Sequence, residues 1–192
     1  MAKRSVKPDW DILFELASSQ DGHFSIKQAK DRGFSNQLVR HHLKGGKIFR
    51  VRRGIYRLVQ YPASDHEDLV VVWLWSEQVG VFSHQTAMAL HDLSDALPAQ
   101  IHLTLPRRWK SRRLRVLPGV VLHHTNVAKV DRAWFGSVPV TSPLRTLKDC
   151  VEAHVVPDLI KQAIESGIDR GLFSRKMVAT VTAKMVGNRK GK

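Results

Sequence analysis

Residues 24–58 read FSIKQAKDRGFSNQLVRHHLKGGKIFRVRRGIYRL, and this stretch decides the fold of the N-terminal third. Ser25 followed by Gln28 is a capping-box pattern, which predicts that a short helix begins after Ser25. Gly33 can adopt a positive φ, so we expect it to end that helix in a tight turn. Ser35 then caps another helix, whose apolar residues recur at helical spacing until two glycines stop it. A short helix, a glycine turn and an amphipathic helix together predict a helix-turn-helix.

The remainder of the stretch predicts a β-hairpin with a basic face. Apolar and basic residues alternate over residues 47–53 and again over 55–59, which is the period of a strand. Gly54 lies between the two runs and supplies the bend. A hairpin directly after a helix-turn-helix is a wing, so residues 1–61 are expected to form a winged helix-turn-helix DNA-binding domain. A winged helix that binds protein is the main alternative.

The exposed face of the second helix of this motif carries side chains that can recognise bases. Asn and Gln can form paired hydrogen bonds with adenine, and Arg can do so with guanine, while Lys and Arg attract phosphates. A histidine on this face either contacts phosphate or lies exposed at the surface. The predicted DNA-binding residues are Ser35, Asn36, Gln37, Arg40, His41 and Lys44 on the helix, and Arg50, Arg52, Arg53 and Arg57 in the hairpin.

Charge is distributed unevenly along the 192 residues, whose formal net charge is +14. Residues 62–104 contain no lysine or arginine, whereas residues 1–61 and 105–149 are strongly basic. Basic clusters favour contact with the phosphate backbone of a nucleic acid, and an ordinary solvated basic surface is the alternative.

The single cysteine, Cys150, cannot form an internal disulfide, and the longest apolar run is too short to span a bilayer. We therefore expect a cytoplasmic protein that does not enter the membrane.

The sequence pattern changes after Tyr61, and we place a domain boundary there. Residues 62–192 are expected to form a mixed α/β domain with a small sheet and terminal helices, so the predicted fold class of the chain is α+β. The predicted strands are 101–105, 120–124 and 137–141, and the predicted helices begin near Pro143, Pro157 and Ser174.

A very basic segment with one tryptophan follows the first of these strands and is predicted to be an exposed loop. It could contact the DNA backbone or an acidic patch on a partner protein, and a plain solvated loop is the third interpretation. The residues in question are Arg107, Arg108, Lys110, Arg112 and Arg113.

No motif of catalysis or cofactor binding is present in the sequence. There is no HExxH, no cysteine pair, no P-loop, no GxSxG elbow and no glycine-rich dinucleotide turn. His123 and His124 are adjacent, so their rings should point to different faces. His84 and His91 could share a helix face, but Asp92 is the only carboxylate near them. The sequence therefore predicts that the protein is not an enzyme, and that it has no cofactor and no metal site.

Several segments, taken in order, resemble the AbiEi-type antitoxins of abortive-infection toxin–antitoxin systems. The resemblance covers most of residues 10–180. In the N-terminal third its segments are 24–29, 33–35 and 50–58, and further along the chain they are 83–87, 90–95, 101–106 and 140–147.

This resemblance implies a two-part role. The winged helix would bind double-stranded DNA at inverted repeats in the promoter of its own operon and repress transcription. The C-terminal domain would counteract a cognate nucleotidyltransferase-like toxin in a type IV system, in which direct binding of the toxin is not expected. The alternatives are a winged-helix regulator without a toxin and a protein-interaction module whose basic faces bind an acidic partner.

Overall fold

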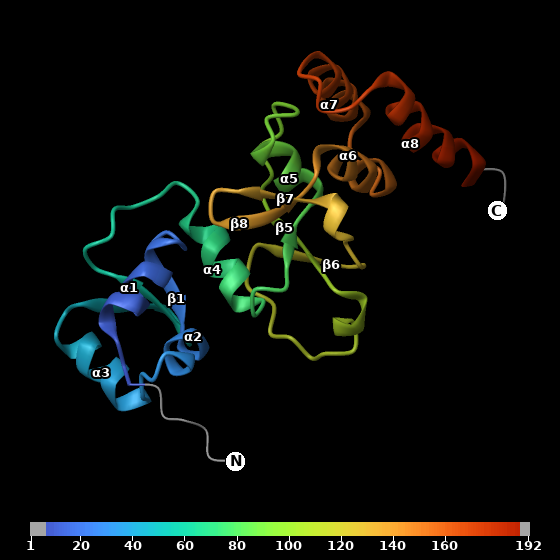
Figure 1. The fold of residues 1–192 in the computed structure, drawn as a ribbon. Helices are drawn as coiled ribbons and strands as arrows, with labels where there is room; N and C mark the ends of the chain where they lie inside the picture. Colours follow the sequence, from blue (N-terminus) through green and yellow to red (C-terminus); the bar gives the residue numbers. More distant parts are fainter. Residues whose placement is uncertain (1–6, 189–192) are drawn as a thin grey trace. The chain divides into compact units, whose positions relative to one another are not determined.

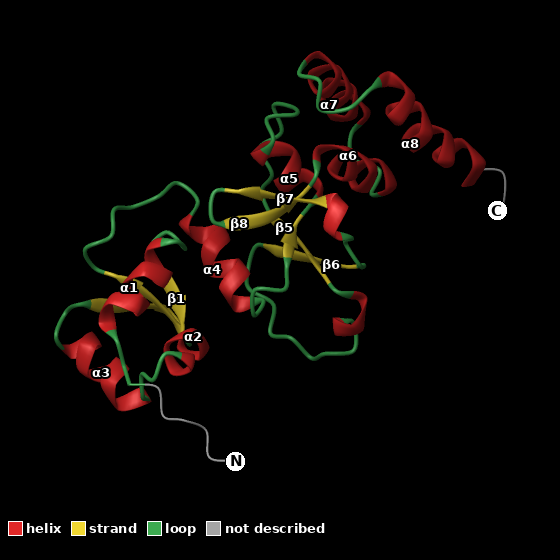
Figure 2. Cartoon of the chain, viewed as in Figure 1, coloured by secondary structure: helices red, strands yellow, loops and turns green. Residues whose placement is uncertain are grey.

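The computed structural model describes residues 7–188, and its contacts divide the chain into two compact units, Met1–Gln78 and Val79–Lys192. Each unit combines helices with one small sheet, as Figures 1 and 2 show. The predicted α+β class is therefore confirmed, including a winged helix-turn-helix followed by a mixed α/β part.

The first unit contains four helices and a three-stranded antiparallel sheet, in the part of the chain that the structure describes. The strand order is β1-β3-β2, so the hairpin strand β3 lies in the middle. The helices are α1 (Trp10–Ser18), α2 (Ile26–Asp31), α3 (Asn36–Lys44) and α4 (Glu67–Trp75), and the strands are β1 (His23–Ser25), β2 (Ile48–Arg52) and β3 (Ile55–Leu58).

Helices α2 and α3 begin at the capping residues that the sequence predicts. The Ser25 hydroxyl accepts a hydrogen bond from the Gln28 backbone N–H at 3.2 Å, and the Gln28 side chain accepts one from the Ser25 N–H at 2.8 Å. This closed capping box starts α2 as predicted. The Ser35 hydroxyl accepts from the Leu38 N–H at 3.1 Å and starts α3. Each of the two helices of the helix-turn-helix thus begins at a local side-chain hydrogen bond.

The wing is a hairpin whose turn lies at Arg53 and Gly54. Gly54 has φ +79°, a left-handed conformation that suits glycine. The register of β2 against β3 shifts between Arg50 and Arg52, which marks a β-bulge at Val51. The third strand, β1, is too short to be seen in the sequence pattern. It pairs with β3, with His23 opposite Arg57.

Helix α4 belongs to the first unit because it packs against β1 and β3. Its first residue, Glu67, also forms an ion pair with Arg57 of β3. The division between the units consequently falls after Gln78, further along the chain than the boundary that the sequence pattern placed after Tyr61.

The second unit is built on a five-stranded mixed sheet with the strand order β6-β5-β4-β8-β7. Strand β5 runs parallel to β6 and antiparallel to β4, while β8 runs parallel to β4 and antiparallel to β7. The strands are β4 (Val81–Phe82), β5 (Ile101–Leu105), β6 (Val120–His124), β7 (Arg132–Phe135) and β8 (Val138–Thr141), with 3-10 turns η1 (Arg107–Trp109) and η2 (Lys129–Asp131).

Within the described residues, four helices accompany this sheet. Helix α5 packs on β5 and on α6, and α6 in turn packs on α7 and α8. Their shared core includes Met88, Leu93, Leu147 and Phe173, all buried. The helices are α5 (His84–Leu90), α6 (Pro143–Glu152), α7 (Pro157–Asp169) and α8 (Arg175–Asn188). None of the helices within residues 7–188 is long and apolar enough to cross a membrane.

The close approach of α7 to the chain that follows it depends on Gly167. A Cβ atom added to Gly167 would overlap the ring of Phe173, which is itself buried in the helical core. Glycine is therefore required here for space, since the residue lies within a helix and its φ is not positive.

We expect Gly167→Ala to destabilise the protein by about 1–3 kcal/mol, because overpacking of the Phe173 ring outweighs the gain in helix propensity. Urea unfolding followed by circular dichroism measures this change. The matched control is Lys161→Ala on the exposed part of α7, which should change the stability by less than about 0.5 kcal/mol. Equal stability of both variants would contradict the packing described for Gly167.

Candidate nucleic-acid interface

Helix α3 presents a continuous polar face to solvent. Asn36, Gln37, Arg40, His41 and Lys44 are all exposed. Asn, Gln and Arg are the side chains that form paired hydrogen bonds with base edges, and a helix of this diameter fits the DNA major groove. Ser35, which was also predicted to bind DNA, is exposed, and its hydroxyl is engaged as the helix cap.

The opposite face of α3 holds the helix in this orientation. Val39 is buried in the core of the first unit, together with side chains such as Leu13 and Phe24. The ring of His42 lies with its centroid 4.6 Å from that of Trp10 on α1. Burial lowers the pKa of His42, with Lys47 and His41 contributing in the same direction. His42 is thus a packing residue, whereas its neighbour His41 faces solvent.

The wing adds a cluster of exposed arginines, Arg50, Arg52 and Arg53. The bulge at Val51 interrupts the strict alternation of the strand, so side chains at 50, 51 and 52 are all exposed. Residues 32–64 contain eight lysines or arginines and no aspartate or glutamate. Exposed basic side chains beside a polar helix face favour contact with a phosphate backbone.

Arg57 differs from the other predicted wing arginines, because the structure turns it inward. It is 8% exposed, and its Nη2 donates to the Glu67 carboxylate at 2.6 Å and to the Pro62 carbonyl at 3.0 Å. These contacts separate Arg57 from the exposed arginines of the wing, and its contact with DNA stays a prediction. Its side chain lies on the face of β3 opposite to that of Leu58, and its charge is paired with the first residue of α4.

The basic segment of the second unit follows β5 and includes η1. Arg107, Arg108, Lys110, Arg112 and Arg113 are exposed, as predicted for a loop. Trp109 is buried, and the Arg112 guanidinium lies 3.9 Å from the centroid of its ring. The backbone N–H of Arg107 donates to the Asn126 side chain at 3.1 Å. These contacts hold the start of the segment against the chain that follows β6.

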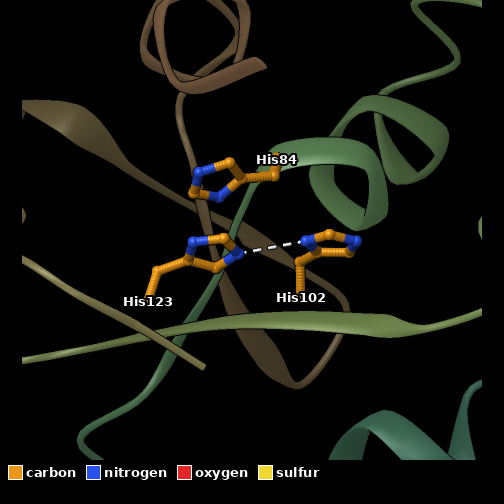
Figure 3. Close-up of side chains that lie close together, drawn as sticks. All are labelled: His84, His102 and His123. Atoms are coloured by element: carbon orange, nitrogen blue, oxygen red, sulfur yellow. Dashed lines mark hydrogen bonds between the residues drawn. The ribbon is translucent and has the colours of Figure 1, made fainter. Parts of the chain in front are cut away.

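Three histidines that the sequence analysis did not connect lie together in the second unit. Figure 3 shows His84, His102 and His123, which come from the start of α5, from β5 and from β6. One nitrogen of each ring lies within 4.8 Å of the others, so the group can hold a metal ion. The sequence analysis compared histidines only along single helices and strands. The parallel pairing of β5 and β6 brings His102 and His123 together, the start of α5 adds His84, and no local spacing signals this.

Burial lowers the pKa of all three rings and so favours neutral imidazole. Burial, followed by the positive charge of neighbouring histidines, lowers the pKa of His84 to about 3 and that of His123 to about 4. Burial also lowers the pKa of His102. Neutral imidazole is the form that binds metal ions.

The ion pair between Arg57 and Glu67 should stabilise the first unit. We expect Arg57→Ala to cost about 2–3 kcal/mol, because it leaves Glu67 and the Pro62 carbonyl without their charged donor. Urea unfolding measures this loss. Arg53→Ala removes the same charge from the exposed turn and should change stability by less than about 0.5 kcal/mol. An unchanged stability of Arg57→Ala, with a smaller salt dependence of DNA binding, would restore Arg57 to the DNA-contacting set.

Comparisons with known proteins agree with the fold and with the N-terminal motif. The crystal structure of the RV2827C protein from Mycobacterium tuberculosis is similar, with a TM-score of 0.55 over 95% of this chain and 75% of that one. The two sequences are 14% identical, so this likeness concerns the fold alone. No curated protein sequence matches significantly. Residues 11–59, which span α1 to the end of the wing, match a family model described as "Transcriptional regulator, AbiEi antitoxin". In this segment the chain is therefore similar to the AbiEi antitoxin family of transcriptional regulators.

Proposed function

We propose that this protein is a sequence-specific transcriptional repressor that binds double-stranded DNA through α3 and the wing. The observation that carries the proposal is the exposed row of Asn36, Gln37 and Arg40 beside an acid-free group of wing arginines. Helix α3 enters the major groove and its side chains contact base edges, while Lys44 and the wing arginines contact phosphates. The protein acts in the cytoplasm as a regulator and not as an enzyme, in keeping with the family of residues 11–59.

The operator is a pair of inverted repeats in the promoter of the protein's own operon. Two copies of one winged helix related by a two-fold axis read two such half-sites. The second unit serves the antitoxin role and counteracts a cognate nucleotidyltransferase-like toxin. Both statements extend the family description of residues 11–59 to the activity of the whole chain.

The basic segment of the second unit provides additional phosphate contacts. Arg107, Arg108 and Arg113 are exposed and positively charged, and residues 107–113 contain no Asn or Gln that could contact adenine. Such a surface adds affinity that is independent of sequence and sensitive to salt. An acidic patch on a partner protein is the other surface that it fits.

The central test is a binding titration with the upstream DNA of the protein's own gene and with a scrambled duplex, at two salt concentrations. We expect Gln37→Ala and Arg40→Ala to weaken binding to the upstream DNA by about 1–3 kcal/mol each and to reduce its preference over the scrambled duplex. Arg53→Ala should weaken binding to both duplexes equally and lower the salt slope by about one.

Arg175→Ala, which removes an exposed charge at the start of α8, is the matched control and should leave binding unchanged. An undiminished sequence preference in both Gln37→Ala and Arg40→Ala would reject α3 as the recognition helix. Equal binding of both duplexes that disappears with salt would leave only non-specific attraction, and an acidic protein partner would then be the better proposal.

Autoregulation and the antitoxin role are tested separately in cells. A reporter gene under the upstream promoter should be repressed by the wild-type chain and derepressed by the double variant Gln37→Ala/Arg40→Ala, because only base recognition is removed. The same double variant should still relieve toxicity when it is expressed with a nucleotidyltransferase-like protein encoded beside it, because that role is assigned to the second unit. Repression without any relief of toxicity would favour a regulator that has no toxin partner.

A further inference from the structure

His84, His102 and His123 converge on one face of the sheet in the second unit. His102 lies on β5 and His123 on β6, and the register places His123 opposite Thr104, so both side chains project from the same face. His102 Nδ1 lies 3.0 Å from His123 Nε2, and the two rings are nearly parallel, with 15° between their planes. The His84 ring stacks on that of His123, with 3.6 Å between centroids (Figure 3).

Hydrogen bonds from outside the cluster hold His84 in place. His84 Nδ1 lies 2.9 Å from the hydroxyl of Ser83, and that hydroxyl lies 2.7 Å from the Thr104 hydroxyl on β5. The other ring nitrogen of His84 is left for a ligand. In metal-binding histidines, one ring nitrogen usually forms a hydrogen bond that orients the ring, and the second nitrogen binds the metal.

The backbone of His84 is also held in an uncommon conformation. Its φ is +54°, in the left-handed region, although the residue is 8% exposed and opens α5. The first turn of α5 is fastened to β5, since the Thr86 hydroxyl accepts a hydrogen bond from the His102 N–H at 2.8 Å. Local strain of this kind persists where the surrounding structure enforces it, and it is concentrated at functional sites.

We propose that His84, His102 and His123 bind one divalent transition-metal ion of the zinc class. One ligand nitrogen of each ring lies within 4.8 Å of the others. Three imidazoles suit Zn²⁺, Co²⁺, Ni²⁺ or Cu²⁺, and they do not suit Mg²⁺ or Ca²⁺, which prefer oxygen ligands. Three protein ligands leave a fourth tetrahedral position for water or an exchangeable ligand.

Binding replaces the hydrogen bond between His102 and His123. A tetrahedral ion holds nitrogens about 2.1 Å away and therefore about 3.4 Å from one another, which is slightly wider than their present separation. The His84 ring tilts out of its stack on His123 so that its free nitrogen faces the ion. The bound ion then links the start of α5 to β5 and β6, and its binding stabilises the second unit.

Arg145 is a nearby positive charge whose effect on this site is smaller than that of burial. Arg145 is the cation that acts on His84, and it contributes less than burial and the two other histidines do. Its guanidinium is paired with Asp149 at 2.7 Å and with Asp131 at 3.2 Å. These two ion pairs reduce the positive charge that Arg145 presents to His84.

The test uses the full chain, without a histidine tag and freed of metal by a chelator, at near-neutral pH. Co²⁺ titration should produce the visible absorption of a tetrahedral ion and saturate at one equivalent per chain, and Zn²⁺ should displace it. Zn²⁺ should also raise the melting temperature in proportion to the logarithm of its free concentration. His102→Gln and His123→Gln should each weaken Co²⁺ binding at least about 10-fold.

The matched control is His124→Gln, because His124 is the next residue on β6 and faces the other side of the sheet. It should bind Co²⁺ as the wild type does. Nitrogen NMR of the wild-type imidazoles provides a reading that needs no substitution: Zn²⁺ should shift one nitrogen of each of the three rings. No saturable Co²⁺ absorption, or shifts confined to other histidines, would overturn the proposal, as would equal Co²⁺ affinity of His123→Gln and the control.

Discussion

The burial of the apolar face of α3 is the constraint on which the proposed interface depends. Val39 is 2% exposed, and it packs in a core that α1, β1 and the hairpin also line. Rotation of α3 about its axis would expose that side chain and bury Arg40 or Asn36, at a cost of several kcal/mol. The core therefore determines which side chains of α3 reach solvent. The Ser35 cap and the Gly33 turn determine where the helix begins.

The features that could be predicted from sequence are those set by neighbouring residues. The capping box at Ser25, the cap at Ser35 and the bend at Gly54 each depend on contacts within a few positions, and the structure confirms them. The exposed row on α3 follows from helical periodicity alone. Strand 101–105 was predicted from its local alternation, and the structure confirms it.

The features that the sequence analysis missed depend on residues far apart in the chain. Arg57 lies in the same hairpin as the exposed arginines, and its partner Glu67 comes from α4, ten residues further along the chain. The same contact draws α4 into the first unit and moves the division to Gln78. The short strands β1 and β4 are defined by their pairing in the sheets and carry no pattern of their own.

The histidine cluster shows the same limit in the second unit. His102 and His123 are brought together by the parallel register of β5 and β6, and His84 by the turn that opens α5. The two adjacent histidines of β6 were correctly expected to point to different faces, and this alternation is what sends His123 alone toward His102. A metal ion at this position would serve the fold of the second unit, whereas base recognition is assigned to the first.

The measurement that most directly tests the central claim is an NMR titration of isotope-labelled protein with a duplex from its own upstream region. The backbone amides at the start of α3 and those of Arg50, Arg52 and Arg53 should shift in proportion to bound DNA, and the amide of Val39 on the buried face should shift less. Shifts confined to residues 107–115, or an absence of shifts at low salt, would contradict the assignment of α3 and the wing as the DNA-binding surface.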